Sequence, residues 1–140
     1  MKRIASLTLI IVLFMGSVLP VSAQDMSVYS TNIAILDPSI SHGNGYLQGS
    51  VLTSFTGSDC HAIYECSLEY KASTGVWTTA SSVHVVRCYE PGAGKLITDN
   101  YYGLSVGTQY RYHVYARVIG PSGYIVDADV VNSSAITYVG

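Results

Sequence analysis

The chain is poor in charged residues, in phenylalanine and in proline. Lys and Arg together number seven, Asp and Glu nine, Phe two and Pro four among 140 residues. Phosphate backbones and anionic lipids are bound by clustered cations, so this scarcity of Lys and Arg argues against nucleic acid and membrane surfaces as partners. Beyond the N-terminal segment no window shows a sustained apolar period of 3.6 residues, which argues against amphipathic helices.

One long apolar run is present, at the N-terminus. Lys2 and Arg3 precede apolar residues over 4–19, and Ala23 ends a small-residue site. This pattern is typical of a secretory signal peptide cleaved after Ala23. A transmembrane anchor is the alternative, but the run is short and polar residues interrupt it. We therefore predict a signal peptide over 1–23 and a secreted, extracellular protein with no stable membrane insertion after cleavage.

The remaining residues, 24–140, have the length of one domain. Without the two cations of the signal peptide they carry five Lys and Arg against nine Asp and Glu, so the mature protein is acidic. The whole chain holds twelve Tyr. A tyrosine ring is apolar and its hydroxyl is polar, which suits strands packed on one side and exposed on the other.

Alternation of apolar and polar residues predicts strands throughout the mature chain. The expected strands cover 26–36, 46–55, 62–71, 76–80, 83–89, 95–102, 110–118, 124–131 and 135–139. Turn residues separate them, and we expect turns at Asp37-Pro38-Ser39, 41–45, 73–75, 90–94 and 120–123. Short strands with turns at this spacing predict an all-β, antiparallel β-sandwich of one domain.

Three of these strands assign residues to faces. The strand over 110–118 places one set inward and the opposite set outward, and the strand over 62–71 does the same. The expected inward residues are Tyr64, Cys66, Leu68, Tyr70, Tyr110, Tyr112, Val114, Ala116 and Val118. Glu65 and Glu69 then face outward, where Arg111 or Arg117 on a neighbouring strand would be natural partners. The expected inward residues of the strand over 46–55 are Leu47, Val51 and Phe55.

The segment from Leu104 reads Leu-x-x-Gly-Thr-x-Tyr-x-Tyr-x-Val-x-Ala, with the first Tyr at Tyr110. This pattern resembles the loop and sixth strand of fibronectin type III domains, and residues 64–77 are similar to the third strand and its turn. The resemblance implies an immunoglobulin-like sandwich in which Tyr110 forms a tyrosine corner, its hydroxyl bonded to the preceding loop. The overall layout also resembles small secreted proteins of unknown function from Gram-positive bacteria.

Three Cys allow at most one disulfide within the chain. If the strand over 62–71 pairs back across the turn at 73–75, residues whose numbers add up to about 148 face each other. That register sets Cys60 against Cys88, and we predict a disulfide between them, with Cys66 in the core. Two alternatives stay open: all three remain reduced, or Cys60, Cys66, His84 and Cys88 bind zinc.

No nucleophile or metalloprotease motif occurs in the chain. Glu65 and Glu69 are about 13 Å apart along a strand, too far for a glycosidase pair. His113 and the aspartates Asp127 and Asp129 are expected at the surface. We predict no catalytic residue, no cofactor-binding residue and no metal ligand, and therefore no enzyme.

The exposed aromatic residues favour a binding module. The candidate binding surface comprises Tyr89, Tyr101, Tyr102 and Tyr115, and the expected partners are a cell-wall glycan, a surface protein or a second copy of the chain. A small secreted toxin or bacteriocin-like effector is the alternative. A hydrolase with an unrecognised site is a third hypothesis.

Overall fold

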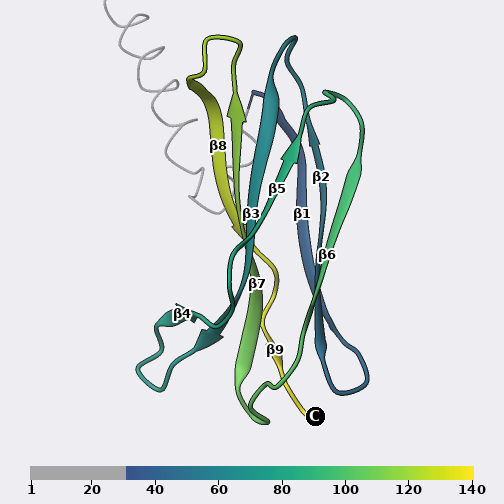
Figure 1. Ribbon diagram of the computed structural model, residues 1–140. Helices are drawn as coiled ribbons and strands as arrows, with labels where there is room; N and C mark the ends of the chain where they lie inside the picture. Colours follow the sequence, from purple (N-terminus) through teal and green to yellow (C-terminus); the bar gives the residue numbers. More distant parts are fainter. Residues whose placement is uncertain (1–30) are drawn as a thin grey trace, which may run out of the picture.

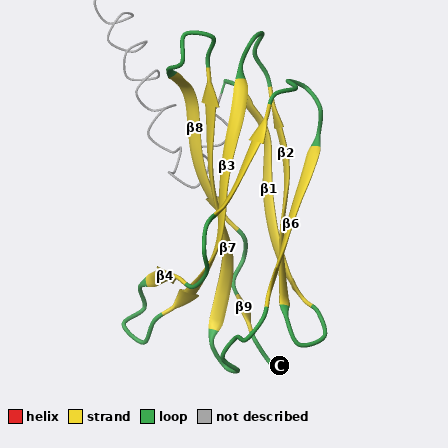
Figure 2. Ribbon diagram, in the orientation of Figure 1, coloured by secondary structure: helices red, strands yellow, loops and turns green. Residues whose placement is uncertain are grey.

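The computed structural model describes residues 31–140, so the predicted signal peptide and residues 24–30 lie outside the described residues. The described residues form β-strands and loops without a helix (Figure 2). The strands are β1 (Ile33–His42), β2 (Leu47–Phe55), β3 (His61–Lys71), β4 (Trp77–Thr79), β5 (His84–Cys88), β6 (Lys95–Tyr101), β7 (Gln109–Ile119), β8 (Ile125–Asn132) and β9 (Ile136–Thr137).

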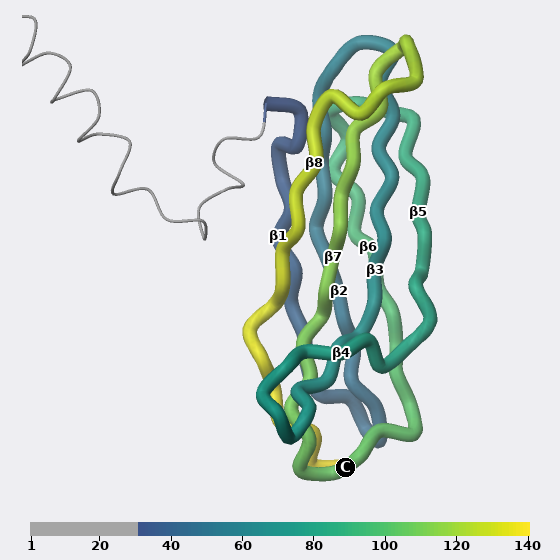
Figure 3. The backbone as a smooth tube through the Cα atoms, turned by 90° about the vertical axis from the view of Figure 1, so that its left-hand side faces the viewer, coloured from purple at the N-terminus to yellow at the C-terminus, as the bar shows by residue number. Residues whose placement is uncertain are grey.

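The strands make two antiparallel sheets that pack face to face (Figures 1 and 3). One sheet has the order β1-β2-β6. The other has the order β4-β3-β7-β8, with β5 also paired to β3 and β9 to β7. The short strand β4 projects away from the two sheets (Figure 1). The predicted all-β fold with antiparallel sheets is confirmed.

The predicted turn at Asp37-Pro38-Ser39 is wrong, because all three residues lie inside β1, where Pro38 pairs with Val51. Strand β1 is at the edge of its sheet and has only β2 beside it. A proline lacks a backbone N–H, and an edge position tolerates this because no second neighbour requires that donor. The first strand therefore continues to His42, whereas the other predicted strands agree with the structure within a few residues.

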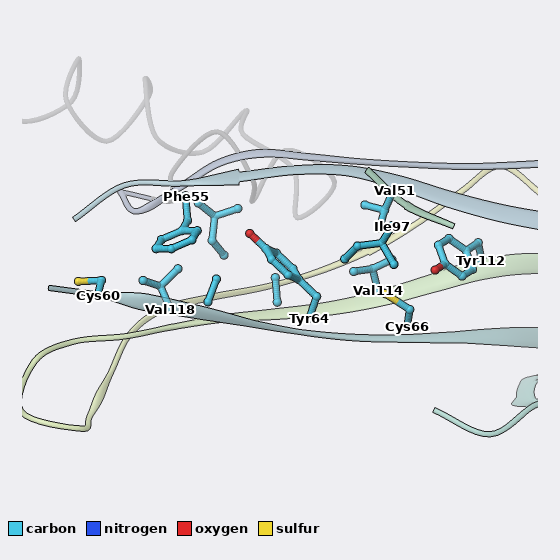
Figure 4. Packing of buried hydrophobic residues seen from close by; sticks show 12 residues of the cluster. Val51, Phe55, Cys60, Tyr64, Cys66, Ile97, Tyr112, Val114 and Val118 are labelled. Atoms are coloured by element: carbon cyan, nitrogen blue, oxygen red, sulfur yellow. The ribbon is translucent and has the colours of Figure 1, made fainter. Parts of the chain in front are cut away.

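The core lies between the sheets, and the faces predicted for three strands are confirmed. Every residue of β2, β3 and β7 that was expected to point inward is buried except Tyr70, which is half-buried. Thr53, Ala62 and Ser67 are buried as well, although they are not among the predicted inward residues. Figure 4 shows Tyr64, Val114 and Tyr112 from one sheet against Phe55, Val51 and Ile97 from the other. Removal of these apolar side chains from water is the main force holding the sheets together.

An aspartate joins the two sheets at each open side of the sandwich. On one side Asp127 of β8 accepts hydrogen bonds from the backbone N–H groups of Asn32 and Ile33, at 2.8 and 3.0 Å. On the other side Asp99 of β6 accepts one from the Tyr112 hydroxyl at 2.6 Å and one from Nδ1 of His84, also at 2.6 Å. Hydrogen bonds to a carboxylate are stronger than neutral ones, so both contacts stabilise the packing of the sheets.

The expectation that Asp129 is a surface residue is wrong, whereas Asp127 is half-buried. Asp129 is 7% exposed, and its Oδ1 accepts a hydrogen bond from the N–H of Val130 at 2.8 Å. Its Oδ2 is buried without a hydrogen-bond partner among the described residues. Burial raises the pKa of the Asp129 carboxyl above its ordinary value; the hydrogen bond from the Val130 N–H opposes this shift, and the charge of Asp127 adds a smaller increase.

Replacing Asp129 with asparagine is expected to stabilise the protein at neutral pH. A raised pKa means that the folded protein binds the proton more tightly than the unfolded chain does. Stability therefore falls as the pH rises from the unfolded value of about 3.9 through the raised folded value, and it stays lower above that value. The amide of the Asp129→Asn variant does not ionise, so the variant should lose this decline. Urea unfolding of both proteins between pH 3 and 8 measures it.

Asp37→Asn is the matched control for Asp129→Asn, because Asp37 is exposed on β1. This control should leave the difference in the free energy of unfolding between acid and neutral pH as it is in the wild type. An Asp129→Asn protein that is less stable than the wild type at neutral pH, with the same decline on raising the pH, would contradict the assignment.

Candidate binding site

A groove of about 450 Å³ lies on the outer face of the larger sheet. Strands β3 and β7 form its floor, because Glu65 pairs with Tyr115 and Ser67 with His113 across these strands. Since β4 and β5 lie beyond β3, and β8 lies beyond β7, residues from those segments form the sides of the groove. These residues are Thr79, Val83 and Val130.

The polar floor of the groove is held in place by contacts between neighbouring strands. Nε of Arg111 donates to Oε1 of Glu69 at 2.8 Å, and Nη2 of Arg117 lies 3.5 Å from Oε2 of Glu65. The prediction that these arginines pair with the outward glutamates is confirmed. Nδ1 of His113 donates to Oδ1 of Asn132 at 2.7 Å. These contacts restrict the side chains of the floor before a ligand arrives, although Nε of Arg117 is buried without a hydrogen-bond partner among the described residues.

Tyr115 in the groove and Trp77 of β4, outside it, each have an arginine over the ring. The guanidinium carbon of Arg117 lies 5.4 Å from the ring centroid of Tyr115, and that of Arg111 lies 4.4 Å from the ring of Trp77. A cation over an aromatic face is attracted by the electrons of the ring. These contacts orient Tyr115 at the floor and attach Trp77 of β4 to β7.

Two of the three residues at the sides of the groove, Val83 and Val130, are apolar, and the third is Thr79. Val83 and Val130 are 52% and 51% exposed, so their side chains are accessible to a ligand. A groove with apolar residues at its sides, an aromatic ring and fixed hydrogen-bonding groups suits a small ring that has both an apolar face and polar edges. The contribution of Val83 and Val130 was not anticipated from the sequence.

The four tyrosines predicted as a binding surface lie in different places. Tyr115 lines the groove. Tyr89, 67% exposed, stacks against His61 with 5.4 Å between ring centroids. Tyr102 is also 67% exposed and contacts Tyr46, whereas Tyr101 is half-buried and packs against the core. The structure therefore does not bring the four rings together.

Tyr110 lies at the start of β7, and its ring is buried. Its hydroxyl accepts a hydrogen bond from the backbone N–H of Ser105 at 3.0 Å. Gly107, with φ of 84°, bends the loop, and its N–H donates to the carbonyl of Tyr138. The Tyr110 side chain thus ties the loop between β6 and β7 to the start of β7.

The predicted disulfide between Cys60 and Cys88 is wrong, because all three cysteines are free. The numbers of paired residues add up to 148 between β3 and β4, as expected, but to 150 between β3 and β5. The shift arises where the hydroxyl of Ser81 accepts the N–H of Leu68 in place of a backbone carbonyl. Cys88 consequently faces Ala62 rather than Cys60.

The structure does not gather the four residues of the zinc alternative. Cys66 and His84 pair across β3 and β5. Cys60 lies far from Cys66, toward the opposite end of the row of buried side chains (Figure 4). Within residues 31–140, no group of three or more His, Cys, Asp or Glu side chains is arranged to hold a metal ion.

Cys66, His84 and Asp99 lie near one another, a combination of residue types that can serve nucleophilic catalysis. The Cys66 side chain is completely buried, and burial raises the pKa of its thiol to about 11. The thiol therefore stays protonated at neutral pH, and a protonated, enclosed sulfur is a poor nucleophile. Burial also raises the pKa of Tyr112, whose hydroxyl donates to Asp99. The hydrogen bonds of this cluster connect the two sheets.

The sequence matches no known protein-family profile, and no curated protein is found to be similar to it. Residues 31–140 contain no helix that is long and apolar enough to cross a membrane.

Proposed function

We propose that the protein is a secreted, non-catalytic binding module that takes a saccharide in the groove on the outer face of β3 and β7. The observation that carries this proposal is the combination of the exposed Val83 and Val130 with a floor of Tyr115, Glu65 and His113. The groove also lies on paired strands, which hold binding groups more rigidly than loops do.

The chemistry of the groove favours a saccharide over a peptide. A pyranose ring has faces of C–H groups and an edge of hydroxyls. The valines and Tyr115 can contact the faces, while carboxylate, hydroxyl and imidazole groups can accept or donate at the edge. Glu65 provides the carboxylate that lines the groove, and its charge is compensated by Arg117, so the groove has no uncompensated carboxylate to attract an ionic ligand.

We also propose that the sandwich is of the fibronectin type III or immunoglobulin-like kind and that the chain is exported after cleavage at Ala23. The orders β1-β2-β6 and β3-β7-β8 match the A-B-E and C-F-G groupings of such domains. The bond between Ser105 and Tyr110 supports a tyrosine corner in the strand that corresponds to F.

Retention on insoluble polysaccharides tests the saccharide proposal. The mature wild-type protein should co-sediment with at least one of peptidoglycan, chitin, cellulose and xylan, and soluble fragments of that polysaccharide should release it. Replacing Tyr115 with alanine removes the ring at the floor and should lower the affinity at least about tenfold, because stacked aromatic groups dominate contacts of this kind.

Tyr124→Ala is the matched control, because Tyr124 is 76% exposed and lies outside the groove. Its retention should equal that of the wild type. A wild-type protein that remains in the supernatant with all four polysaccharides would refute the proposal. Equal retention of Tyr115→Ala and wild type would show that any binding occurs elsewhere.

A further inference from the structure

A second hollow, of about 430 Å³, lies near the end of the sandwich that carries the C-terminus (Figure 1). It is formed by the end of β3, the end of β4 with the residue after it, the loop between β6 and β7, and the start of β7. The side chains that matter here are Tyr70, Thr79, Tyr102, Ser105, Thr108 and Tyr110. None of the residues that line it is charged, and aromatic rings and hydroxyl groups provide its functional groups.

The most exposed of these rings, Tyr102, is supported from behind. The ring of Tyr46 lies 5.2 Å from that of Tyr102, between centroids. Tyr46 in turn covers Gly43 so closely that a Cβ at that position would overlap its ring. Tyr102 therefore presents a large aromatic surface, 67% exposed, on a packed base. Such a ring loses little conformational freedom when a ligand contacts it.

The loop that carries Tyr102 is anchored at several points. The N–H of Ser105 donates to the Tyr110 hydroxyl, the N–H of Gly107 donates to the carbonyl of Tyr138, and the N–H of Tyr138 donates to the carbonyl of Thr108. These bonds fix the loop to β7 and to the C-terminal segment. The hollow thus has a defined shape before a ligand binds, as small-molecule sites commonly have.

Thr79, an exposed residue at the end of β4, lines both this hollow and the groove on the outer face. The two depressions therefore adjoin at Thr79. Strand β4 is attached to β7 beside this point through Trp77 and Arg111. A ligand that fills both depressions has to pass over Thr79, so it has to be an extended chain.

We propose that the hollow beside Tyr102 is a second subsite for the same ligand, and that the ligand is an uncharged oligosaccharide chain lying across Thr79. This inference rests on the saccharide-binding function proposed for the groove. The hollow takes neutral sugar units, because it offers tyrosine faces and hydroxyl groups but no ion-pairing group. Two linked subsites strengthen binding because the second contact is made within the same complex.

Titration calorimetry with a series of oligosaccharides tests this proposal. The probes are fragments of the polysaccharide that retains the protein, from disaccharide to octasaccharide. Affinity should rise with length by roughly a hundredfold, the lower end of the gain from linked sites, and then reach a plateau. Tyr102→Ala should remove most of this rise but leave the affinity of the disaccharide unchanged. Tyr115→Ala should weaken binding of every length.

Two further variants examine the crossing point. Thr79→Trp places a bulky ring between the subsites and should abolish the gain in affinity with chain length, so that this variant binds its longest and shortest probes equally well. Thr79→Ser keeps a small hydroxyl side chain and should bind as the wild type does. Thermal unfolding of each variant verifies that it is folded.

The outcomes separate this inference from the function on which it rests. Binding of the disaccharide that depends on Tyr115, with no gain in affinity for longer chains, would overturn the second subsite and leave the groove intact. An equal loss at every length in Tyr102→Ala would overturn it as well. Failure of every polysaccharide to bind the wild type would remove both proposals.

Discussion

Replacing Gly49 with alanine is expected to lower the free energy of unfolding by about 3 kcal/mol, the cost of serious overpacking in a core. Gly49 lies in β2 between Ile40 of β1 and Asp99 of β6. The ring of Tyr112, which is completely buried, covers it so closely that a Cβ would overlap the ring atoms. The ring cannot turn away without abandoning its hydrogen bond to Asp99, and β2 cannot retreat because it is paired on both edges.

Gly94→Ala is the matched control for Gly49→Ala. A Cβ at Gly94 would have no atom within 4 Å, and its backbone does not have the positive φ that favours glycine. This variant should unfold within about 0.5 kcal/mol of the wild type, as surface substitutions usually do. Urea unfolding measures both. A Gly49→Ala protein as stable as Gly94→Ala would show that the two sheets can separate slightly at this point without cost.

Removing the carboxylate of Asp99 is expected to have the next largest effect on stability. In Asp99→Ala the buried hydroxyl of Tyr112 loses its acceptor, and His84 loses its partner in the opposite sheet. An unsatisfied buried polar group costs about 1–3 kcal/mol, so we expect a loss of about 2–3 kcal/mol. Asp37→Ala removes an exposed carboxylate from β1 and should change stability little.

A double-mutant cycle assigns this loss to the contact between Asp99 and Tyr112. In Tyr112→Phe the hydroxyl is absent, so the additional change Asp99→Ala should cost clearly less than it does in the wild type. The difference is the coupling energy between the two side chains, which we expect to be about 1–2 kcal/mol. Strictly additive losses would show that the hydrogen bond contributes nothing and that His84 accounts for the effect.

Much of the candidate site could be predicted from the local pattern. Alternation along β7 places Tyr115 and His113 outward, and alternation along β3 does so for Glu65 and Glu69. These assignments hold because successive side chains of a strand point to opposite faces whatever its neighbours are. The pairing of Glu69 with Arg111 followed from the same pattern once the two strands were taken to be adjacent.

The sides of the groove, and the point at which the groove adjoins the second hollow, could not be predicted in this way. Val83, Val130 and Thr79 come from segments that lie beside β3 and β7 only because of the order of strands in the sheet. The four predicted tyrosines were treated as one surface, but their strands and loops end at different ends and faces of the sandwich. A list of exposed aromatic residues contains no information about which of them are neighbours.

The sequence by itself determined the strand content, the inward faces of the longest strands and the turn at 120–123, because each depends on residues close together in the chain. The tertiary structure alone decided the pairing of Cys88 with Ala62, the burial of Asp129 and the role of Asp99 between the sheets. These features depend on register and on sheet packing. The register with β3 differs by two residues between β4 and β5, and the change falls beside the hydrogen bond from Leu68 to the Ser81 hydroxyl. A shift of two residues keeps every side chain on the same face, so the pattern of apolar residues does not reveal it.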